Sequence, residues 1–335
     1  MDIMRIAIVK LSALGDIVHA MVVLQFIKKF NKEISIDWIV EEGYKDLLEL
    51  HPDINKVHFI NIKQAKKKKS LITLMREFKT INRLSPYDLV IDMQGLIKSA
   101  IIAYLIPSKV TLGFDKHSIR EKSASFFYNK TFNFGYDENV IERNIALIEF
   151  ALGFNITKKE IENKTPFLYS GKANSNIGLS KEKKNILLVP GASHQTKCYS
   201  FKKLAELAAS IDGNFMVIWG NEDEREIANK IKKITPSVKV CDKLTLDSLI
   251  FLISRVDLVV GSDTGPTHIG WSLNIPTITL FGPTPGYRNT YPTLINKIIE
   301  SDSNVNPFKI DKKDYSINQI DVKEILLVCN SLLHN

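Results

Sequence analysis

The chain has 335 residues, 44% hydrophobic and 24% charged, a composition typical of a globular protein and not of a disordered or fibrous one. Its net charge of +8 favours an anionic substrate or surface, but no zinc-finger, basic-zipper or RNP-like pattern accompanies it, so we expect no nucleic-acid partner. The three cysteines form no CxxC pair, and neither a signal peptide nor a membrane-spanning run is visible, which predicts a cytoplasmic protein.

Strand-like and helix-like segments alternate along the first half of the chain. Short apolar runs predict the strands, and apolar side chains at helical spacing predict the helices between them. The expected strands are 6–9, 34–40, 57–60 and 89–92, and the expected helices are 17–27, 71–84, 99–106 and 141–152. This alternation is typical of a doubly wound parallel sheet.

Residues 155–183, rich in lysine, asparagine, serine and glycine, predict a linker, after which the alternation resumes. The expected strands are then 186–189, 215–219, 238–240, 257–260 and 276–281, and the expected helices are 201–211, 223–233, 246–254, 265–273 and 321–333. We therefore predict an α/β protein with two Rossmann-like domains, 1–165 and 180–320, that face a cleft. The terminal segment 321–335 is expected to form a helix that packs back on the first domain.

The loop Lys10–Asp16 follows the first predicted strand, and ligands of open α/β sheets bind at such loops. Gly15 permits a close backbone approach or a positive φ. Asp16 lies near a helix start, so it is either a helix cap or a carboxylate that acts as a general base. The loop is neither a GxGxxG dinucleotide motif nor a Walker loop.

The segment Ser262–His268 directly follows another predicted strand and opens a helix. Thr264 and Gly265 would present backbone N–H groups at the positive end of that helix, where a diphosphate binds without a metal. Asp263 either caps the helix or accepts hydroxyl groups of a sugar. His268 either donates to a phosphate oxygen or packs in the interior.

Two further loops of the second half carry polar residues after strands. Pro190–Lys197 contains small and hydroxyl residues that suit a phosphate, and Lys197 either neutralises a departing diphosphate or is a solvated lysine. Glu224 either accepts the two hydroxyls of a ribose or is an acid that the helix dipole favours in a first turn. In the first half, Lys63 and the run Lys66–Lys69 form either a solvated loop or a patch for anionic lipid or saccharide.

Taken together, these segments resemble the heptosyltransferase family of lipopolysaccharide core synthesis, which is glycosyltransferase family nine with the GT-B fold. The resemblance runs from Arg5 to about Pro285. Asp263–His268 is similar to the donor motif of the family, Phe281–Thr284 to its following strand and turn, and Lys10–Asp16 to its acceptor-side loop. Three strings of the acceptor half are similar to the branch that acts on Kdo2-lipid A: Trp38–Gly43, Asp92–Ala100 and Arg120–Asn129.

The resemblance implies an inverting glycosyltransferase that needs no metal or other cofactor. It implies transfer of heptose from ADP-L-glycero-D-manno-heptose to the inner Kdo of Kdo2-lipid A, at the cytoplasmic face of the inner membrane, which the enzyme contacts peripherally. Asp16 would be the catalytic base. The implied donor-binding residues are Ala192, Ser193, Lys197, Glu224, Leu244, Asp263, Thr264, Gly265 and His268, and the implied acceptor-binding residues are Lys10, Ser12, Gly15, Lys98 and Arg120.

Several positions depart from the pattern of the family, among them Cys198 and Tyr199, which follow Lys197 where the family usually has His or Arg and then Trp. Ala192 lacks the hydroxyl that members often have there, and Leu244 stands where a methionine often packs beside the adenine. The alternatives are another core heptosyltransferase, a sugar-nucleotide epimerase or hydrolase, and a non-catalytic nucleotide-sugar-binding protein. A dinucleotide oxidoreductase is a weaker alternative, because no GxGxxG follows the first strand.

Overall fold

A computed structural model describes residues 3–67, 70–171 and 178–334. The chain divides into two compact units, Met1–Phe167 and Leu168–Asn335, so the division falls inside the predicted linker segment. Each unit holds one six-stranded sheet whose strand pairs are all parallel. The predicted α/β class, with two doubly wound parallel sheets, is confirmed.

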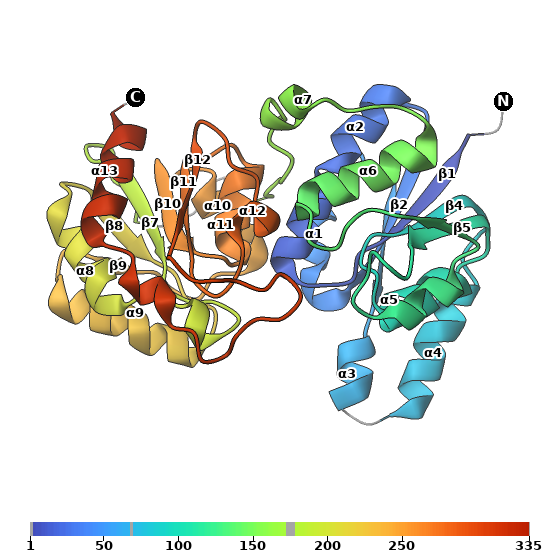
Figure 1. Ribbon diagram of the computed structural model, residues 1–335, viewed down its shortest axis with the longest axis horizontal. Coiled ribbons are helices and arrows are strands. Elements are labelled where there is room, and N and C mark those ends of the chain that lie inside the picture. The colour runs from blue at the N-terminus through green and yellow to red at the C-terminus, as the bar shows by residue number, and fades with distance from the viewer. Residues whose placement is uncertain (1–2, 68–69, 172–177, 335) are drawn as a thin grey trace. The chain divides into compact units, whose positions relative to one another are not determined.

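The sheet of the first unit has the strand order β3-β2-β1-β4-β5-β6 (Figure 1). Its strands are β1 (Arg5–Val9), β2 (Ser35–Glu41), β3 (Lys56–Ile60), β4 (Tyr87–Asp92), β5 (Ser108–Phe114) and β6 (Lys130–Phe132). Its α-helices are α1 (Leu14–Met21), α2 (Val23–Phe30), α3 (Ile62–Lys67), α4 (Leu71–Asn82), α5 (Ile97–Leu105), α6 (Val140–Leu152) and α7 (Lys158–Glu162). Short 3-10 helices lie at η1 (Glu42–Leu47) and η2 (Lys122–Phe127).

Helices cover both faces of this sheet, as the continuous burial of its central strands requires. Figure 1 shows α1, α2 and α6 on one side and α4 and α5 on the other. The core on the α4–α5 side joins Val9 and Val90 of the central strands to Ile81 and Ile102 of the two helices. The predicted helix 17–27 is in fact two helices, α1 and α2, which meet at Val22.

The sheet of the second unit has the strand order β12-β11-β10-β7-β8-β9. Its strands are β7 (Asn185–Val189), β8 (Asn214–Val217), β9 (Lys239–Val240), β10 (Leu258–Ser262), β11 (Thr277–Phe281) and β12 (Asn296–Glu300). Its α-helices are α8 (Phe201–Ser210), α9 (Glu222–Ile234), α10 (Leu246–Ile253), α11 (Gly265–Ser272), α12 (Gly286–Asn289) and α13 (Val322–Leu333). The 3-10 helices η3 (Gln195–Lys197) and η4 (Ser316–Gln319) complete it.

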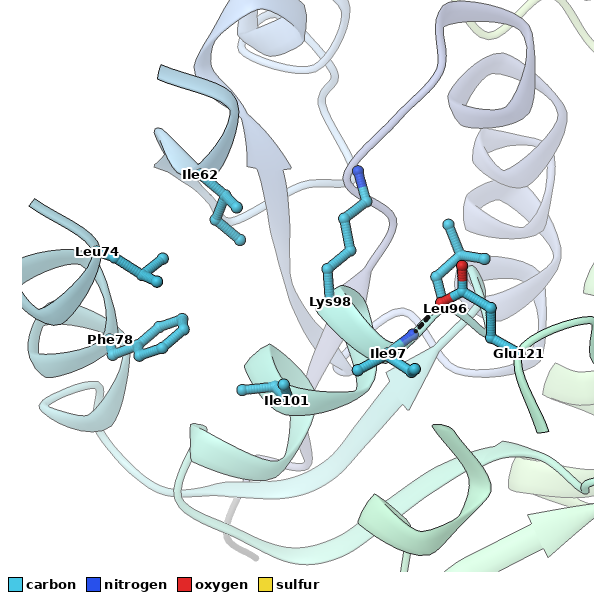
Figure 2. A pocket seen from close by; sticks show the side chains of 8 residues that line it. All are labelled: Ile62, Leu74, Phe78, Leu96, Ile97, Lys98, Ile101 and Glu121. Carbon is cyan, nitrogen blue, oxygen red and sulfur yellow. Dashed lines mark hydrogen bonds between the residues drawn. The ribbon is translucent and has the colours of Figure 1, made fainter. Parts of the chain in front are cut away.

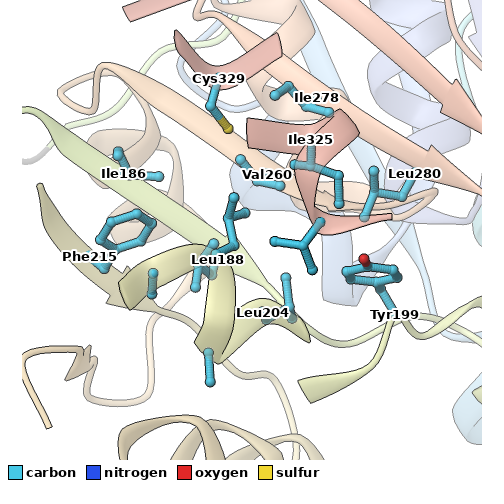
Figure 3. Packing of buried hydrophobic residues seen from close by; sticks show 14 of the residues in the cluster. Ile186, Leu188, Tyr199, Leu204, Phe215, Val260, Ile278, Leu280, Ile325 and Cys329 are labelled. Atoms are coloured by element: carbon cyan, nitrogen blue, oxygen red, sulfur yellow. The ribbon is translucent and has the colours of Figure 1, made fainter. Parts of the chain in front are cut away.

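The terminal helix α13 belongs to the core of the second unit. Ile325 and Cys329 of α13 pack with Val260 of β10, Ile278 of β11 and Leu204 of α8 (Figure 3). The expected packing of 321–335 on the first domain stays a prediction, since the described contacts of the buried face of α13 lie within the second unit. The physical reason for these contacts is the apolar stripe of α13, which covers one face of strands β10 and β11 beside α8.

Both sheets reverse their winding direction at the same point of the strand order. In the first unit the reversal falls between β1 and β4, and in the second between β7 and β10. Ligands of open α/β sheets bind outside the carboxyl ends of the strands at such a point. The loops after these four strands are therefore the places to look for a site.

Candidate functional site

The carboxylate of Asp263, at the carboxyl end of β10, is the centre of a polar cluster in the second unit. Lys197, which ends η3 after β7, places Nζ 2.7 Å from Asp263 Oδ2. His268 Nε2 of α11 lies 3.1 Å from Asp263 Oδ1. Thr284 Oγ1 and Asn289 Nδ2 donate to Oδ2 at 3.1 and 3.2 Å. Loops after three adjacent strands, β11, β10 and β7, thus meet at one carboxylate.

This cluster is almost closed to solvent. The side chains of Lys197 and Asp263 are only 12% and 8% exposed. Burial alone would raise the pKa of Asp263, but the Lys197 ammonium and the hydrogen bond with His268 hold it well below its usual range. Asp263 is therefore an anion that fixes the position of a nearly buried cation.

The first turn of α11 lies directly beside the cluster. Thr264 is the N-cap residue, and Gly265 and Pro266 follow it in partly exposed positions. The hydroxyl of Thr267 lies within hydrogen-bond distance of the carbonyls of Ser262 and Thr264, which fixes the turn. The first N–H groups of a helix have no partner within the helix, so this end can bind an anion.

Two sequence interpretations change at this turn. Asp263 does not cap α11, because its carboxylate accepts from side chains of three other segments and from His268. The ring of His268 is buried with its Nε2 at Asp263, so that nitrogen does not face outward from the helix start. The sequence pattern alone could not separate a cap from a buried ion pair.

Glu224, the third residue of α9, points back to the start of its own helix. Its Oε2 accepts from Gly220 N at 2.7 Å, and its Oε1 accepts from Asn221 Nδ2 at 2.9 Å. A Cβ at Gly191, just after β7, would lie 2.3 Å from Glu224 Cδ. Gly191 therefore lets the loop after β7 lie directly against the Glu224 carboxylate.

The remaining predicted donor residues line the same edge of the sheet. Ala192 is half-buried and Ser193 is exposed in the loop after β7. Burial, together with the nearby Glu224 carboxylate, raises the pKa of the Cys198 thiol, while Lys197 and the Ala192 N–H act the other way. These four residues are therefore close enough to interact electrostatically.

Leu244 lies further along this edge, half-buried between β9 and α10. Beside β9, the indole of Trp219 donates to the carbonyl of Cys241 at 2.7 Å, and Arg225 and Lys243 lie over its ring. Sequence reasoning assigned no role to Trp219, Thr284 or Asn289. A signal existed for Thr284, which follows a predicted strand that neighbours β10.

In the first unit the loops after β1 and β4 are tied together. Leu11 N donates to Gln94 Oε1 at 2.8 Å, and Lys10 Nζ donates to the carbonyl of Met93 at 2.9 Å. Lys10 is only 5% exposed. Its side chain links the two loops, and its role as an acceptor contact stays a prediction.

Ser12 and Lys98 form the more accessible part of this junction. Lys98 Nζ donates to Ser12 Oγ at 3.0 Å, and both residues are half-buried. The buried Asp92 supports the loop from below, because it accepts from Ser99 Oγ at 2.8 Å and Tyr128 Oη at 2.7 Å. The structure thus brings together two predicted acceptor residues.

Asp16 is exposed in the first turn of α1. Its Oδ2 accepts from Ala13 N at 3.2 Å, so it stabilises the helix start, while the rest of the carboxylate faces solvent. Burial, Glu41 and Asp16 raise the pKa of Tyr44, which places the two carboxylates near that phenol. Gly15 is helical, so of the two possibilities that its sequence position left open, a close backbone approach or a positive φ, the positive φ does not apply.

Arg120 is exposed before η2. A pocket of about 400 Å³ lies beside Lys98, between α4 and α5. Figure 2 shows Leu74 and Phe78 of α4 facing Ile62 and Ile101 across it. The interior is apolar, and the charged side chains in its lining are Lys98 and Glu121.

Among residues 3–67, 70–171 and 178–334, no cluster of three or more His, Cys, Asp or Glu side chains could hold a metal ion. None of the described helices combines the length and apolar character that crossing a bilayer requires. Of the predicted lysine patch, Lys68 and Lys69 lie outside the described residues, as do the side chains of Lys63 and Lys66.

Known proteins resemble this chain over nearly its whole length. The profile of glycosyltransferase family 9 (heptosyltransferase) matches residues 75–313. Lipopolysaccharide heptosyltransferase 1 of Campylobacter coli is 39% identical, and the alignment covers 98% of this chain and 99% of the relative. The E. coli heptosyltransferase WaaC solved with ADP superimposes with a TM-score of 0.80 at 23% identity, covering 98% of this chain and 100% of that one. WaaC with ADP-2-deoxy-2-fluoro heptose gives 0.78 at the same identity, covering 98% and 99%.

Proposed function

Because this chain belongs to glycosyltransferase family 9, we propose that it is a heptosyltransferase of lipopolysaccharide core synthesis with the activity of heptosyltransferase 1. The donor is ADP-L-glycero-D-manno-heptose, and the acceptor is the inner Kdo of Kdo2-lipid A. The observation that carries the proposal is the nearly buried Lys197–Asp263 pair beside the first turn of α11. Such a site suits a diphosphate group.

In this proposal the second unit binds the donor. The first N–H groups of α11, beginning at Gly265, and the ammonium of Lys197 hold the diphosphate, with Thr264 beside them at the N-cap position. Glu224 accepts the ribose hydroxyls, and Leu244 packs beside the adenine. Ser193 supplies a hydroxyl to the phosphates, while Ala192 contributes only its backbone, since it lacks a side-chain donor.

Asp263 and His268 act within the same donor site as positioning residues. The Asp263 carboxylate already binds Lys197, His268, Thr284 and Asn289, so we assign it the orientation of the lysine and not a direct contact with heptose hydroxyls. A pre-oriented cation stabilises charge that develops in the transition state without reorganising at that moment.

The reaction is a single displacement at the anomeric carbon. The acceptor oxygen forms a bond to that carbon as the bond to the ADP oxygen breaks, and the configuration inverts. Asp16 takes the proton of the acceptor hydroxyl. The electron pair of the broken bond leaves on the diphosphate, where Lys197 and the α11 terminus stabilise the new charge. Lys197 and the α11 terminus supply the positive charge that neutralises the departing diphosphate, so we propose no metal or other cofactor.

The first unit binds the acceptor, which carries carboxylate and phosphate groups. Ser12 lies in the loop after β1, and Lys98 in the first turn of α5 after β4, and a hydrogen bond of 3.0 Å joins them at the β1–β4 reversal. Arg120 is an exposed cation of the same unit. Since the acceptor is a lipid, we propose that the protein contacts the cytoplasmic face of the inner membrane peripherally.

The decisive experiment measures transfer of heptose by mass spectrometry, using Kdo2-lipid A and, in parallel, the same lipid already carrying one heptose. We expect product only with the first acceptor. Product only with the second would identify a different core heptosyltransferase. ADP release that is independent of any acceptor would indicate a hydrolase, and ADP-heptose binding without turnover would indicate a non-catalytic binding protein.

A further inference from the structure

Helix α4 exposes three large apolar side chains to solvent. Leu71, Ile72 and Met75 are 75%, 67% and 70% exposed. Single exposed apolar residues are common, but three within two turns of one helix form a patch that favours an interaction surface. Figure 1 shows α3 and α4 side by side at one end of the first unit.

The exposed side chains continue an apolar sector that begins inside the protein. At about 100° per residue, Ile81, Leu74 and Phe78 lie next to Leu71 and Met75 around the helix. Ile81 is buried, whereas Leu74 and Phe78 line the pocket between α4 and α5 (Figure 2). Only part of the apolar face of α4 therefore packs against the protein, and the rest is exposed to solvent.

Basic side chains flank the exposed part of this sector. Lys67 at the end of α3, Arg76 beside Ile72 around α4, and Lys79 one turn beyond Met75 on the same face of α4 are all exposed. The one acidic residue of α4, Glu77, is half-buried and accepts from Asn61 N at 3.2 Å. An apolar face bordered by lysine and arginine is the pattern of helices that lie in the interface of an anionic membrane.

We propose that α4 docks on an anionic lipid bilayer, with Leu71, Ile72 and Met75 inserted at the acyl boundary and Lys67, Arg76 and Lys79 facing the head groups. The long basic side chains extend toward the head groups while their stems remain against apolar surface. The inference rests on the proposed function in one respect, because a lipid-linked acceptor requires the enzyme to work at a membrane.

The test measures sedimentation of the full chain with vesicles of phosphatidylglycerol and with vesicles of phosphatidylcholine. We expect binding to the first that weakens with salt, and little binding to the second. Replacing Leu71, Ile72 and Met75 together by glutamine, which keeps helix propensity, should weaken binding about 100-fold or more. Replacing Lys67, Arg76 and Lys79 by glutamine should cost about fivefold for each residue.

The matched control replaces Leu294 and Leu327, which are 88% and 72% exposed in the second unit, by glutamine and should bind as the wild type does. Equal binding by the α4 triple variant, or an equal loss in the control, would overturn the proposal. So would a wild-type dimer that the triple variant converts to monomer, because α4 would then bind a second copy of the chain.

The vesicles contain no sugar nucleotide and no acceptor, so this result is independent of catalysis. With a deacylated, water-soluble acceptor the α4 triple variant should transfer heptose at the wild-type rate. Absence of transfer by every protein, wild type included, would reject the proposed function and leave the docking result unaffected. Lost transfer by the triple variant alone on the soluble acceptor would overturn the docking role of α4.

Discussion

Replacing Lys197 by methionine tests the central ion pair, because it removes the cation and keeps a side chain of similar length. The Asp263 carboxylate would stay buried and would keep its hydrogen bonds with His268, Thr284 and Asn289. Breaking a buried pair in this way costs about 3–5 kcal/mol, since one uncompensated charge remains. We expect the free energy of unfolding at pH 7 to fall by that amount.

The stability difference between the wild type and Lys197→Met should also change with pH in a definite direction. In the wild type the pKa of Asp263 is lowered, so its carboxylate adds stability above the unfolded pKa of about 3.9, and that stability is lost as the pH falls. Without Lys197, burial should raise this pKa, and protonation would relieve the uncompensated charge. The stability difference between the two proteins should therefore narrow as the pH falls from 7 toward 4.

The assay is urea unfolding of the full chain at several pH values, with tryptophan fluorescence as the probe. Combining Lys197→Met with Asp263→Asn should recover much of the lost stability, since no charge is then left unpaired. Lys202→Met, at an exposed position of α8, is the control and should change little. A Lys197→Met protein as stable as the wild type at pH 7 would refute the reasoning.

Three further predictions concern single side chains. Asp16→Asn keeps an oxygen for the helix start and should lower the transfer rate about 100-fold or more while ADP affinity, measured by calorimetry, changes only a few-fold; an unchanged rate would remove Asp16 as the base. Gly191→Ala forces its Cβ against the carboxyl group of Glu224, so the Kd for ADP should rise, and equal affinity would contradict a ribose contact. Asn289→Ala removes one donor from buried Asp263 and should cost about 1–3 kcal/mol in thermal or urea unfolding; no loss would show that the site adapts.

The fold was predictable where apolar runs are continuous, because buried parallel strands such as β7 and β10 carry no polar side chain until their ends. The strands missing from the prediction are β5, β6 and β12, each of which begins with polar residues. β5 begins Ser-Lys, and β12 begins Asn-Lys and ends in glutamate, so neither gives an unbroken apolar run. The break between α1 and α2 at Val22 also leaves no mark in the apolar spacing.

The candidate site was predictable as a set of loops but not as a network. Asp263, Lys197 and His268 could be singled out because they follow strands, yet their mutual contacts depend on strand order in space. Asn289 follows no strand directly, so only the structure brings it to Asp263. The buried state of Lys10 likewise depends on Met93 of a neighbouring strand loop.

The strand order of the second sheet has a consequence for how the chain folds during synthesis. One edge of β7 pairs with β8, but the other edge pairs with β10, which is translated only after β8, α9, β9 and α10. At ribosomal speeds this leaves an open apolar strand edge for roughly 3–14 s. Such an exposed edge is a template for aggregation, so we expect the chain to be most prone to aggregation at this stage of translation.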